Sequence, residues 1–278
     1  MQSASRLHKA LKKGGATFGA WQMLPGANIS KTLASTGVDW ICVDTEHGNI
    51  DDAQMHEAVT AVASFGISPV VRICANEAWM VKRALDSGAH GIIVPLLYTP
   101  DDARRLVSSA KFPPLGNRGF GSPFAPNTFI TSTSPDGPHK PVALMDYLQQ
   151  ANDSLVTIVQ IETAEALANV DAIAAIDGID VLLIGPFDLG NNIGRPILTP
   201  ELHPELKEAI AKIHAAAGQH GKGTGIYCTG VEQAKMYQEN GFHMISICND
   251  VGALSGFFGN ALQILKPTNG GVGGGVRY

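Results

Sequence analysis

The chain has 278 residues, of which 45% are hydrophobic and 16% are charged, and its formal net charge is -5. This composition fits a globular protein with a large core. The negative charge argues against a nucleic-acid partner, because no dense stripe of Lys or Arg offsets it. No apolar run approaches the roughly 20 residues of a membrane-spanning helix. The N-terminus also lacks the apolar region of a secretory signal, so we expect a cytoplasmic protein with no membrane partner.

Short apolar runs rich in β-branched residues recur along the chain. Near-continuous apolar runs of this kind are typical of parallel strands that are covered on both faces. Eight of them are found, at residues 17–21, 40–44, 68–72, 91–95, 156–161, 181–184, 223–227 and 243–247.

The segments between these runs have the pattern of helices. The clearest cover residues 51–59, 78–86, 101–110 and 204–218, and a glycine often follows before the next strand, as a helix C-cap requires. Eight strand–helix units predict a single α/β domain over residues 1–278, a (β/α)₈ TIM barrel with an N-terminal helix. A doubly wound open sheet is the alternative.

Two segments interrupt this rhythm. Residues 111–141 contain seven of the 16 prolines, which predicts an extended loop between the fourth and fifth units. Residues 266–278 are rich in glycine, which predicts a flexible tail. Cys42, Cys74, Cys228 and Cys248 lie in or just after apolar runs without a CxxC pair, so we expect buried free thiols.

Charged side chains gather where predicted strands end. Glu162 and Asp188 follow neighbouring strands and are 26 residues apart, about one strand–helix unit. In a barrel both would reach the same rim, where two carboxylates and water suit a hard divalent cation such as Mg²⁺.

Further polar residues follow the second, third and fifth strands. Asp44, Glu46 and His47 come after the second, Arg72 ends the third, and Gln160 ends the fifth. A 2-oxo acid chelated by the cation would place its keto oxygen against Arg72 as an enolate forms, and His47 has a suitable pKa for proton transfer. No lysine stands at the same end of a strand, which disfavours a Schiff-base mechanism.

Ordered motifs from about Phe18 to Leu254 resemble the HpcH/HpaI aldolase family, the metal-dependent class II pyruvate aldolases, whose relatives include macrophomate synthase and 2-keto-3-deoxy sugar acid aldolases. The motifs are Asp39-Trp40, Asp44-Thr45-Glu46-His47, Val71-Arg72, Leu85-Asp86-Ser87-Gly88-Ala89, Asn117-Arg118-Gly119, Gln160-Ile161-Glu162-Thr163 and Gly185-Pro186-Phe187-Asp188-Leu189.

The resemblance implies a role for each residue of the site. Glu162 and Asp188 would bind Mg²⁺, with Mn²⁺ or Co²⁺ as alternatives, and Arg72 would stabilise the enolate. His47 would be the acid/base, held by Asp86. Pro186, Phe187 and Asp188 would receive the pyruvate carboxylate, with Gln160 supporting the pocket. Apart from the resemblance, Trp21 on the first predicted strand and Phe187 beside Asp188 are expected either to narrow the pocket or to pack in the core. The family also implies a homo-oligomer, a hexamer or trimer, with the eighth helix exchanged between neighbours.

The predicted reaction is cleavage or formation of 4-hydroxy-2-oxo acids from pyruvate and an aldehyde. An oxaloacetate decarboxylase or a macrophomate-synthase-like enolate-using synthase is an alternative, as is a lyase of acyl-CoA thioesters. A non-catalytic barrel used as a binding module is the alternative from another class. Two departures from the family pattern stand out: Gly190 replaces a frequent serine, and the long loop over residues 128–141 would reshape the aldehyde side of the pocket.

Overall fold

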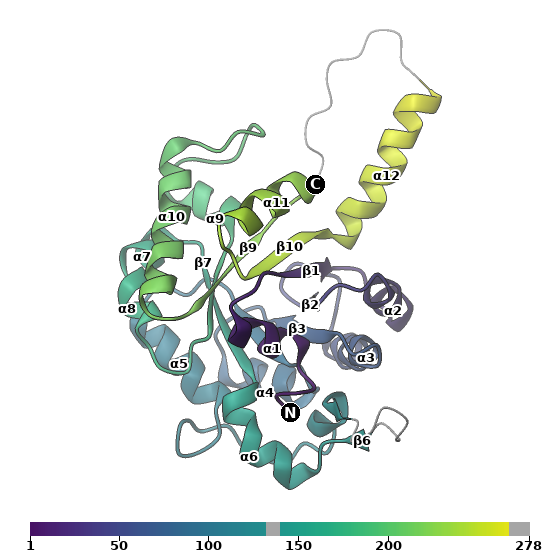
Figure 1. The fold of residues 1–278 in the computed structure, drawn as a ribbon, viewed down its shortest axis with the longest axis vertical. Helices are drawn as coiled ribbons and strands as arrows, with labels where there is room; N and C mark the ends of the chain where they lie inside the picture. Colours follow the sequence, from purple (N-terminus) through teal and green to yellow (C-terminus); the bar gives the residue numbers. More distant parts are fainter. Residues whose placement is uncertain (132–139, 267–278) are drawn as a thin grey trace.

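Eight parallel strands close into a barrel in this computed structural model, which describes residues 1–131 and 140–266 (Figure 1). Around the barrel the order is β1, β10, β9, β8, β7, β4, β3, β2, so β1 pairs with both β10 and β2. The predicted TIM barrel is confirmed. Its strands are β1 (Thr17–Gln22), β2 (Trp40–Asp44), β3 (Ser68–Arg72), β4 (Gly91–Val94), β7 (Val156–Ile161), β8 (Val181–Ile184), β9 (Gly223–Tyr227) and β10 (Met244–Asn249).

Helices surround this barrel and begin at the expected signals. Asp51 and Gln54 form a capping box at the start of α3, and Thr99 and Asp102 form another at the start of α5, where Pro100 is the first helical residue. The helices are α1 (Arg6–Lys13), α2 (Ala27–Ser35), α3 (Asp52–Ala63), α4 (Ala78–Asp86), α5 (Pro100–Ala110), α6 (Leu144–Ser154), α7 (Ala164–Ala168), α8 (Val170–Ala174), α9 (Pro186–Asn192), α10 (Pro204–Gln219), α11 (Val231–Glu239) and α12 (Asp250–Leu265).

The core has one layer inside the barrel and one between strands and helices. Trp40, at the start of β2, fills the interior near the N-terminal ends of the strands. A Cβ at Gly19 would come within 2.2 Å of its ring, so only glycine leaves room for it. Leu7 of the predicted N-terminal helix packs in the same cluster. These side chains close one end of the barrel and leave the carboxyl ends of the strands for a site.

The predicted loop over residues 111–141 contains a 3₁₀ turn, η1 (Ala125–Thr128), and a short antiparallel pair, β5 (Ile130–Thr131) with β6 (Lys140–Pro141); residues 132–139 lie outside the described part. Thr128 Oγ1 donates to the Gly88 carbonyl, and the Thr128 carbonyl is bonded to His90, which precedes β4. The described part of the loop therefore covers the N-terminal ends of the strands. The expectation that it shapes the aldehyde side of the pocket was wrong for these residues.

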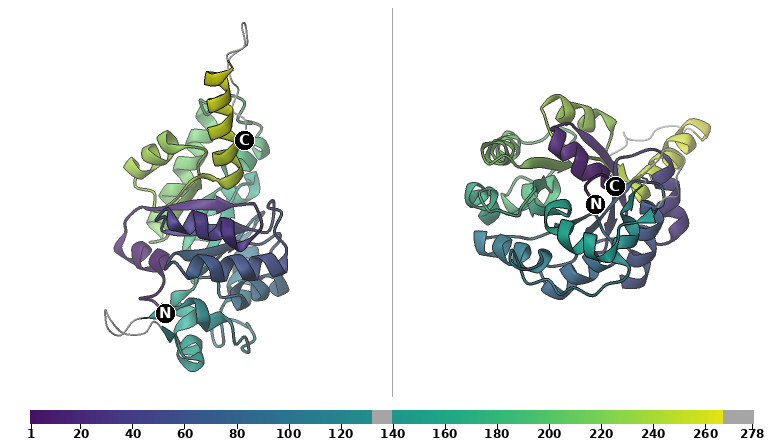
Figure 2. Two further views of the ribbon diagram at one scale, coloured as in Figure 1. Left: turned by 90° about the vertical axis from the view of Figure 1, so that its right-hand side faces the viewer. Right: turned by 60° about the horizontal axis from the view of Figure 1, so that its bottom comes forward.

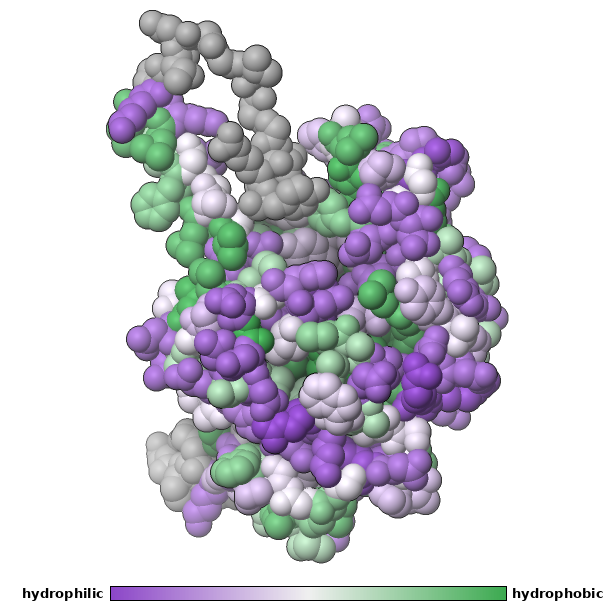
Figure 3. All heavy atoms as spheres, turned by 180° about the vertical axis from the view of Figure 1, so that it is seen from behind, coloured by the Kyte–Doolittle hydropathy of each residue, from purple (hydrophilic) through white to green (hydrophobic). Residues whose placement is uncertain are grey.

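The last helix, α12, projects away from the barrel instead of packing along it (Figures 1 and 2). Its apolar side chains are exposed and run along the protruding helix in Figure 3. They are Val251, Leu254, Phe257, Phe258, Leu262, Ile264 and Leu265. The predicted tail over 266–278 lies outside the described residues from position 267. Within the described ranges, no helix combines the length and the apolar character needed to cross a membrane.

The four cysteines are free thiols, as predicted, but they are not all buried. Cys42 and Cys228 are buried, Cys248 is partly buried, and Cys74 is exposed. Cys74 follows β3 at the rim, where its thiol contacts the Thr45 carbonyl at 2.8 Å, so it is at the edge of the core rather than in it.

Candidate active site

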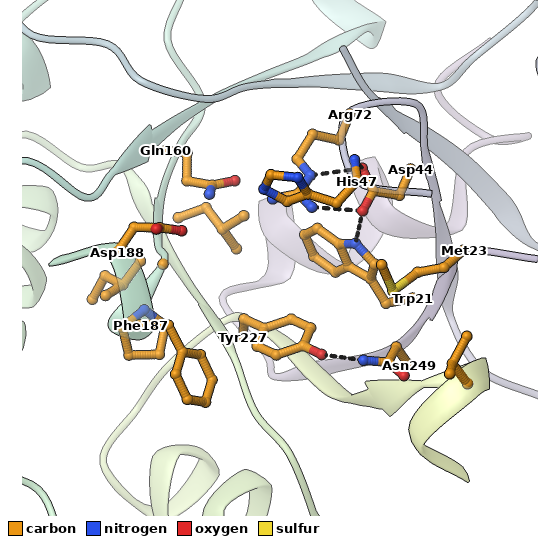
Figure 4. A pocket seen from close by; sticks show the side chains of 15 residues that line it. Trp21, Met23, Asp44, His47, Arg72, Gln160, Phe187, Asp188, Tyr227 and Asn249 are labelled. Carbon is orange, nitrogen blue, oxygen red and sulfur yellow. Dashed lines mark hydrogen bonds and ion pairs between the residues drawn. The ribbon is translucent and has the colours of Figure 1, made fainter. Parts of the chain in front are cut away.

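A cavity of about 380 Å³ opens at the carboxyl ends of the strands (Figure 4). Most of the predicted site residues line it together, which is the arrangement expected of a barrel enzyme. Of those, the structure brings Trp21, His47, Arg72, Gln160, Pro186, Phe187 and Asp188 to its wall, joined by Met23, Asp44, Leu183, Ile184, Gly185, Tyr227, Asn249 and Val251.

Arg72 is buried and held from two sides. The parallel register of β2 and β3 places it beside Asp44, and its Nε and Nη2 donate to Asp44 Oδ1 at 2.9 Å and Oδ2 at 2.5 Å. Its guanidinium also lies 4.9 Å from the centre of the Trp21 ring, whose Nε1 donates to Asp44. Burial would raise the pKa of Asp44, but these hydrogen bonds and the charge of Arg72 outweigh it and lower that pKa. The result is a fixed cation with one orientation.

Glu46 lies between this ion pair and His47. Its Oε2 is 3.0 Å from Arg72 Nη1, an ion-pair distance without the alignment of a hydrogen bond. Burial, with the nearby charges of Asp44 and Asp188, raises the pKa of Glu46 to about 7 despite Arg72. The His47 side chain is 59% exposed, and its Nε2 is 3.8 Å from Glu46 Oε1. An imidazole in this position is accessible to a substrate at the cavity mouth.

Glu162 is only 2% exposed and lies just behind the cavity wall. Its Oε1 accepts from the Leu96 amide at 2.8 Å, with Leu96 in the left-handed region at φ 48, and its Oε2 accepts from Gln160 Nε2. A Cβ at Gly185 would come within 2.6 Å of Oε2, so this position must be glycine for the carboxylate to lie there.

Asp188 faces the same space from the first turn of α9. Burial, followed by the charges of Asp188 and Glu46, raises the pKa of Glu162 to about 7, although hydrogen bonds from Leu96 and Gln160 oppose this. Two carboxylates whose charges disfavour each other suit a shared cation.

These two carboxylates fit a divalent metal. Across the described parts of the chain, no group of three or more His, Cys, Asp or Glu side chains is placed to enclose an ion. Mg²⁺ is usually bound by one or two carboxylates together with water and substrate oxygens, so a pair is the expected donor set. The buried Gln160 Oε1 also has no partner among the described residues, leaving one more acceptor near the pair.

The predicted pairing of His47 with Asp86 is not formed within this chain. Asp86 is the last residue of α4 and precedes β4, so it lies at the N-terminal end of the barrel, whereas His47 follows β2 at the other end. Asp86 Oδ1 instead accepts from Arg118 Nη2 at 2.8 Å. Because helices in a barrel run back toward the strand starts, a residue at the end of one cannot reach the site above its own barrel.

Tyr227 and Asn249 line the cavity but were not predicted as site residues. They lie at the ends of β9 and β10. Tyr227 was not predicted because an aromatic residue in an apolar run is usually part of the hydrophobic core. The two-residue alternation of side chains along β9 could have identified Tyr227 as a cavity residue. Gly225 packs against Leu183 inside the barrel, and Tyr227, two residues later, shares its interior face at the carboxyl end.

Comparison with known proteins agrees with this geometry. The profile of the family described as HpcH/HpaI aldolase/citrate lyase matches residues 18–255. A 2-dehydro-3,6-dideoxy-6-sulfogluconate aldolase of Pseudomonas putida is 34% identical over 92% of this chain and 95% of its own. A hydroxypyruvate/pyruvate aldolase of Sagittula stellata is 36% identical over 74% of this chain and 76% of its own.

Solved structures match the whole barrel as well. A HpcH/HpaI aldolase/citrate lyase family protein from Burkholderia cenocepacia superposes with a TM-score of 0.82 at 33% identity. The match covers 96% of this chain and 100% of the other. The fold and the family predicted from the sequence are therefore confirmed.

Proposed function

Because the chain belongs to the HpcH/HpaI aldolase/citrate lyase family, we propose that it is a divalent-metal-dependent carbon–carbon lyase. It would cleave or form 4-hydroxy-2-oxo acids through the enolate of pyruvate. The observation that carries this proposal is the meeting of Arg72 with Glu162 and Asp188 at one cavity. A buried cation and a carboxylate pair are what a 2-oxo acid needs when its keto oxygen gains negative charge.

Glu162 and Asp188 would hold the metal, Mg²⁺ first, with Mn²⁺ or Co²⁺ also compatible with oxygen ligands. When bound, the cation supplies Lewis-acid polarisation of the keto group. The Leu96 amide and the Gln160 amide orient Glu162, and the missing side chain at Gly185 leaves space for its carboxylate. Gln160 thereby supports the pocket through its hydrogen bond to Glu162.

Arg72 would stabilise the enolate. Asp44 and Trp21 fix its guanidinium before substrate arrives, so no reorganisation is needed as charge develops on the keto oxygen. The pyruvate carboxylate would be received by the chain at Pro186, Phe187 and Asp188, in the first turn of α9. The methyl carbon of pyruvate would then point toward the open side of the cavity.

His47 would move the proton. In cleavage it takes the proton from the 4-hydroxyl group as the carbon–carbon bond breaks, and it protonates the methylene carbon of the enolate to release pyruvate. Glu46, rather than Asp86, is the carboxylate that this chain places beside the imidazole.

Pyruvate release from a 4-hydroxy-2-oxo acid tests this proposal. Protein stripped with a chelator should be inactive and should recover with Mg²⁺ or Mn²⁺. Oxaloacetate, which gives the same enolate by decarboxylation, should be processed more slowly if aldol cleavage is the reaction. Faster release from oxaloacetate would favour the decarboxylase instead, and equal, negligible release before and after metal reloading would contradict both.

We also propose that the protein is a homo-oligomer, a hexamer or a trimer. The apolar residues of α12, such as Phe257 and Ile264, are 71% and 79% exposed in the single chain, which is a costly arrangement for a lone molecule in water. Sedimentation velocity should show an assembly, and Phe257→Asp should weaken it. A monomer at micromolar concentration would contradict this.

A further inference from the structure

A polar pair lies on the wall of the cavity opposite Asp44 and Arg72 (Figure 4). Tyr227 and Asn249 end the neighbouring strands β9 and β10, and Asn249 Nδ2 donates to the Tyr227 hydroxyl oxygen at 2.6 Å. The surroundings are otherwise apolar: the Trp21 ring meets the Tyr227 ring edge-on at 5.2 Å, and the Phe187 ring is 6.4 Å away. A hydrogen-bonding pair on an apolar wall is the usual means by which a pocket fixes the orientation of a ligand.

The direction of this hydrogen bond is set by the backbone. Asn249 caps α12, and its Oδ1 accepts from the Gly252 amide at 2.5 Å. Its Nδ2 can therefore only donate, and the Tyr227 oxygen must accept. The hydroxyl proton of Tyr227 then has no acceptor in the described part of the chain, since Asn249 is its only hydrogen-bond partner there. Tyr227 thus presents a donor to whatever occupies the cavity.

The charges around the pair indicate what that occupant is. Among the described residues that line the cavity, Arg72 is the only side chain with a permanent positive charge, and Asp44 and Glu46 already pair with it. An anionic group against Tyr227 would have to rely on Arg72, which lies beyond the Trp21 ring and is already neutralised by Asp44 and Glu46. A neutral hydroxyl oxygen needs only the donor that Tyr227 offers.

We propose that Tyr227, oriented by Asn249, binds a hydroxyl oxygen of the aldehyde that reacts with the enolate. The preferred aldehydes are then neutral hydroxyaldehydes, not aldehydes that carry a carboxylate or sulfonate. The Tyr227 pair is on the far wall from Arg72, so a molecule that reaches both would span the cavity. This inference rests on the proposed aldolase function and specifies its second substrate.

Steady-state aldol addition of pyruvate to three small aldehydes tests it. Glycolaldehyde carries the hydroxyl group, acetaldehyde lacks it, and glyoxylate carries a carboxylate. The enzymes are the wild type, Tyr227→Phe and Asn249→Asp, loaded with Mg²⁺. Asn249→Asp keeps an oxygen to cap α12, but its carboxylate accepts the Tyr227 proton and turns the donor away from the cavity. Tyr237→Phe is the matched control, because Tyr237 is buried in α11 away from the cavity.

The ratio of kcat/KM for glycolaldehyde to that for acetaldehyde should fall roughly tenfold in Tyr227→Phe and in Asn249→Asp, as expected for one lost hydrogen bond. The ratio of glyoxylate to acetaldehyde should stay the same in Tyr227→Phe and fall in Asn249→Asp, whose new carboxylate repels the anionic aldehyde. Tyr237→Phe should match the wild type in both ratios. An unchanged glycolaldehyde ratio in Tyr227→Phe, or an equal fall with glyoxylate in that variant, would overturn the inference while leaving the aldolase intact. If the wild-type protein neither adds pyruvate to any of these aldehydes nor exchanges the methyl protons of pyruvate, the proposed function is wrong and the inference is wrong with it.

Discussion

The two ends of the barrel both bury polar groups, but they do so in different ways. At the N-terminal end, His90 is fully enclosed, with Nδ1 bonded to Ser68 and Nε2 to the Thr128 carbonyl. Nearby, Asp86 pairs with Arg118. At the carboxyl end, Glu162, Asp188 and Glu46 carry charges that disfavour one another, with Arg72 as the permanent cation.

This contrast indicates that the N-terminal end of the barrel serves stability and the carboxyl end serves chemistry. Burial keeps the His90 ring neutral and its partners satisfied, so the N-terminal end is stable without any ligand. The carboxyl end buries carboxylates whose negative charges repel one another, and this lowers the stability of the fold. Such an arrangement is useful only when a bound cation or substrate neutralises those charges. Changes at the carboxyl end should therefore impair chemistry, and changes at the N-terminal end should impair stability.

Loss of Glu162 should have the largest effect. Glu162→Gln keeps the side-chain volume and removes a metal-type charge, so Mg²⁺ binding measured by calorimetry should be lost. The fall in kcat should be at least the roughly 10²–10³-fold of a missing transition-state donor. Glu165→Gln, an exposed change in α7, is the control. Undiminished Mg²⁺ binding by Glu162→Gln would contradict the assignment of this ligand.

His90 should make stability depend on pH. Burial lowers the pKa of His90 to about 4 from the model-peptide value of 6.5. The unfolded chain therefore binds the proton first, so this contribution is full above pH 6.5 and is lost as pH falls from 6.5 to 4. It amounts to about 3 kcal/mol. Urea unfolding across this range should show a shallower pH dependence in His90→Asn than in the wild type. Equal slopes in the two proteins would refute it.

Restoring the frequent family serine at position 190 should destabilise the protein. A Cβ at Gly190 would meet the Arg195 carbonyl oxygen at 2.7 Å, so the chain after α9 must shift. We expect Gly190→Ser to lower the free energy of unfolding by about 1–3 kcal/mol. Gly218→Ser in α10, where a Cβ has open space, should cost less. If both variants unfold alike, the close approach is unimportant.

The smallest effect is expected on the outer surface. Arg83 Nε donates to Asp52 Oδ1 at 3.1 Å between α4 and α3, and both side chains are about half exposed. Asp52→Asn should change the free energy of unfolding by less than about 1 kcal/mol, and the difference should shrink in high salt. Thermal unfolding at two salt concentrations measures it. A larger loss would mean that this pair contributes more than exposed pairs usually do.

The sequence predicted the barrel well because each strand is a nearly continuous apolar run, and the strand ends then pointed to Arg72, Glu162 and Asp188 as candidate site residues. The His47–Asp86 pair came from family resemblance alone, and the position of Asp86 before β4 keeps it from forming within one chain. Tyr227 was missed because its run resembles core. The direction of α12 was not predictable, since an apolar helix has the same sequence pattern whether it covers its own barrel or another surface.

Exchange of pyruvate methyl protons in D₂O, followed by NMR, tests the enolate site most directly because it requires no aldehyde. We predict exchange by the wild type that depends on Mg²⁺ or Mn²⁺ and falls about 10²-fold or more in Arg72→Ala, whose lost guanidinium leaves the keto oxygen without its donor. Exchange that is absent in both proteins, or equal in both with and without metal, would contradict the assignment of this cavity to enolate chemistry.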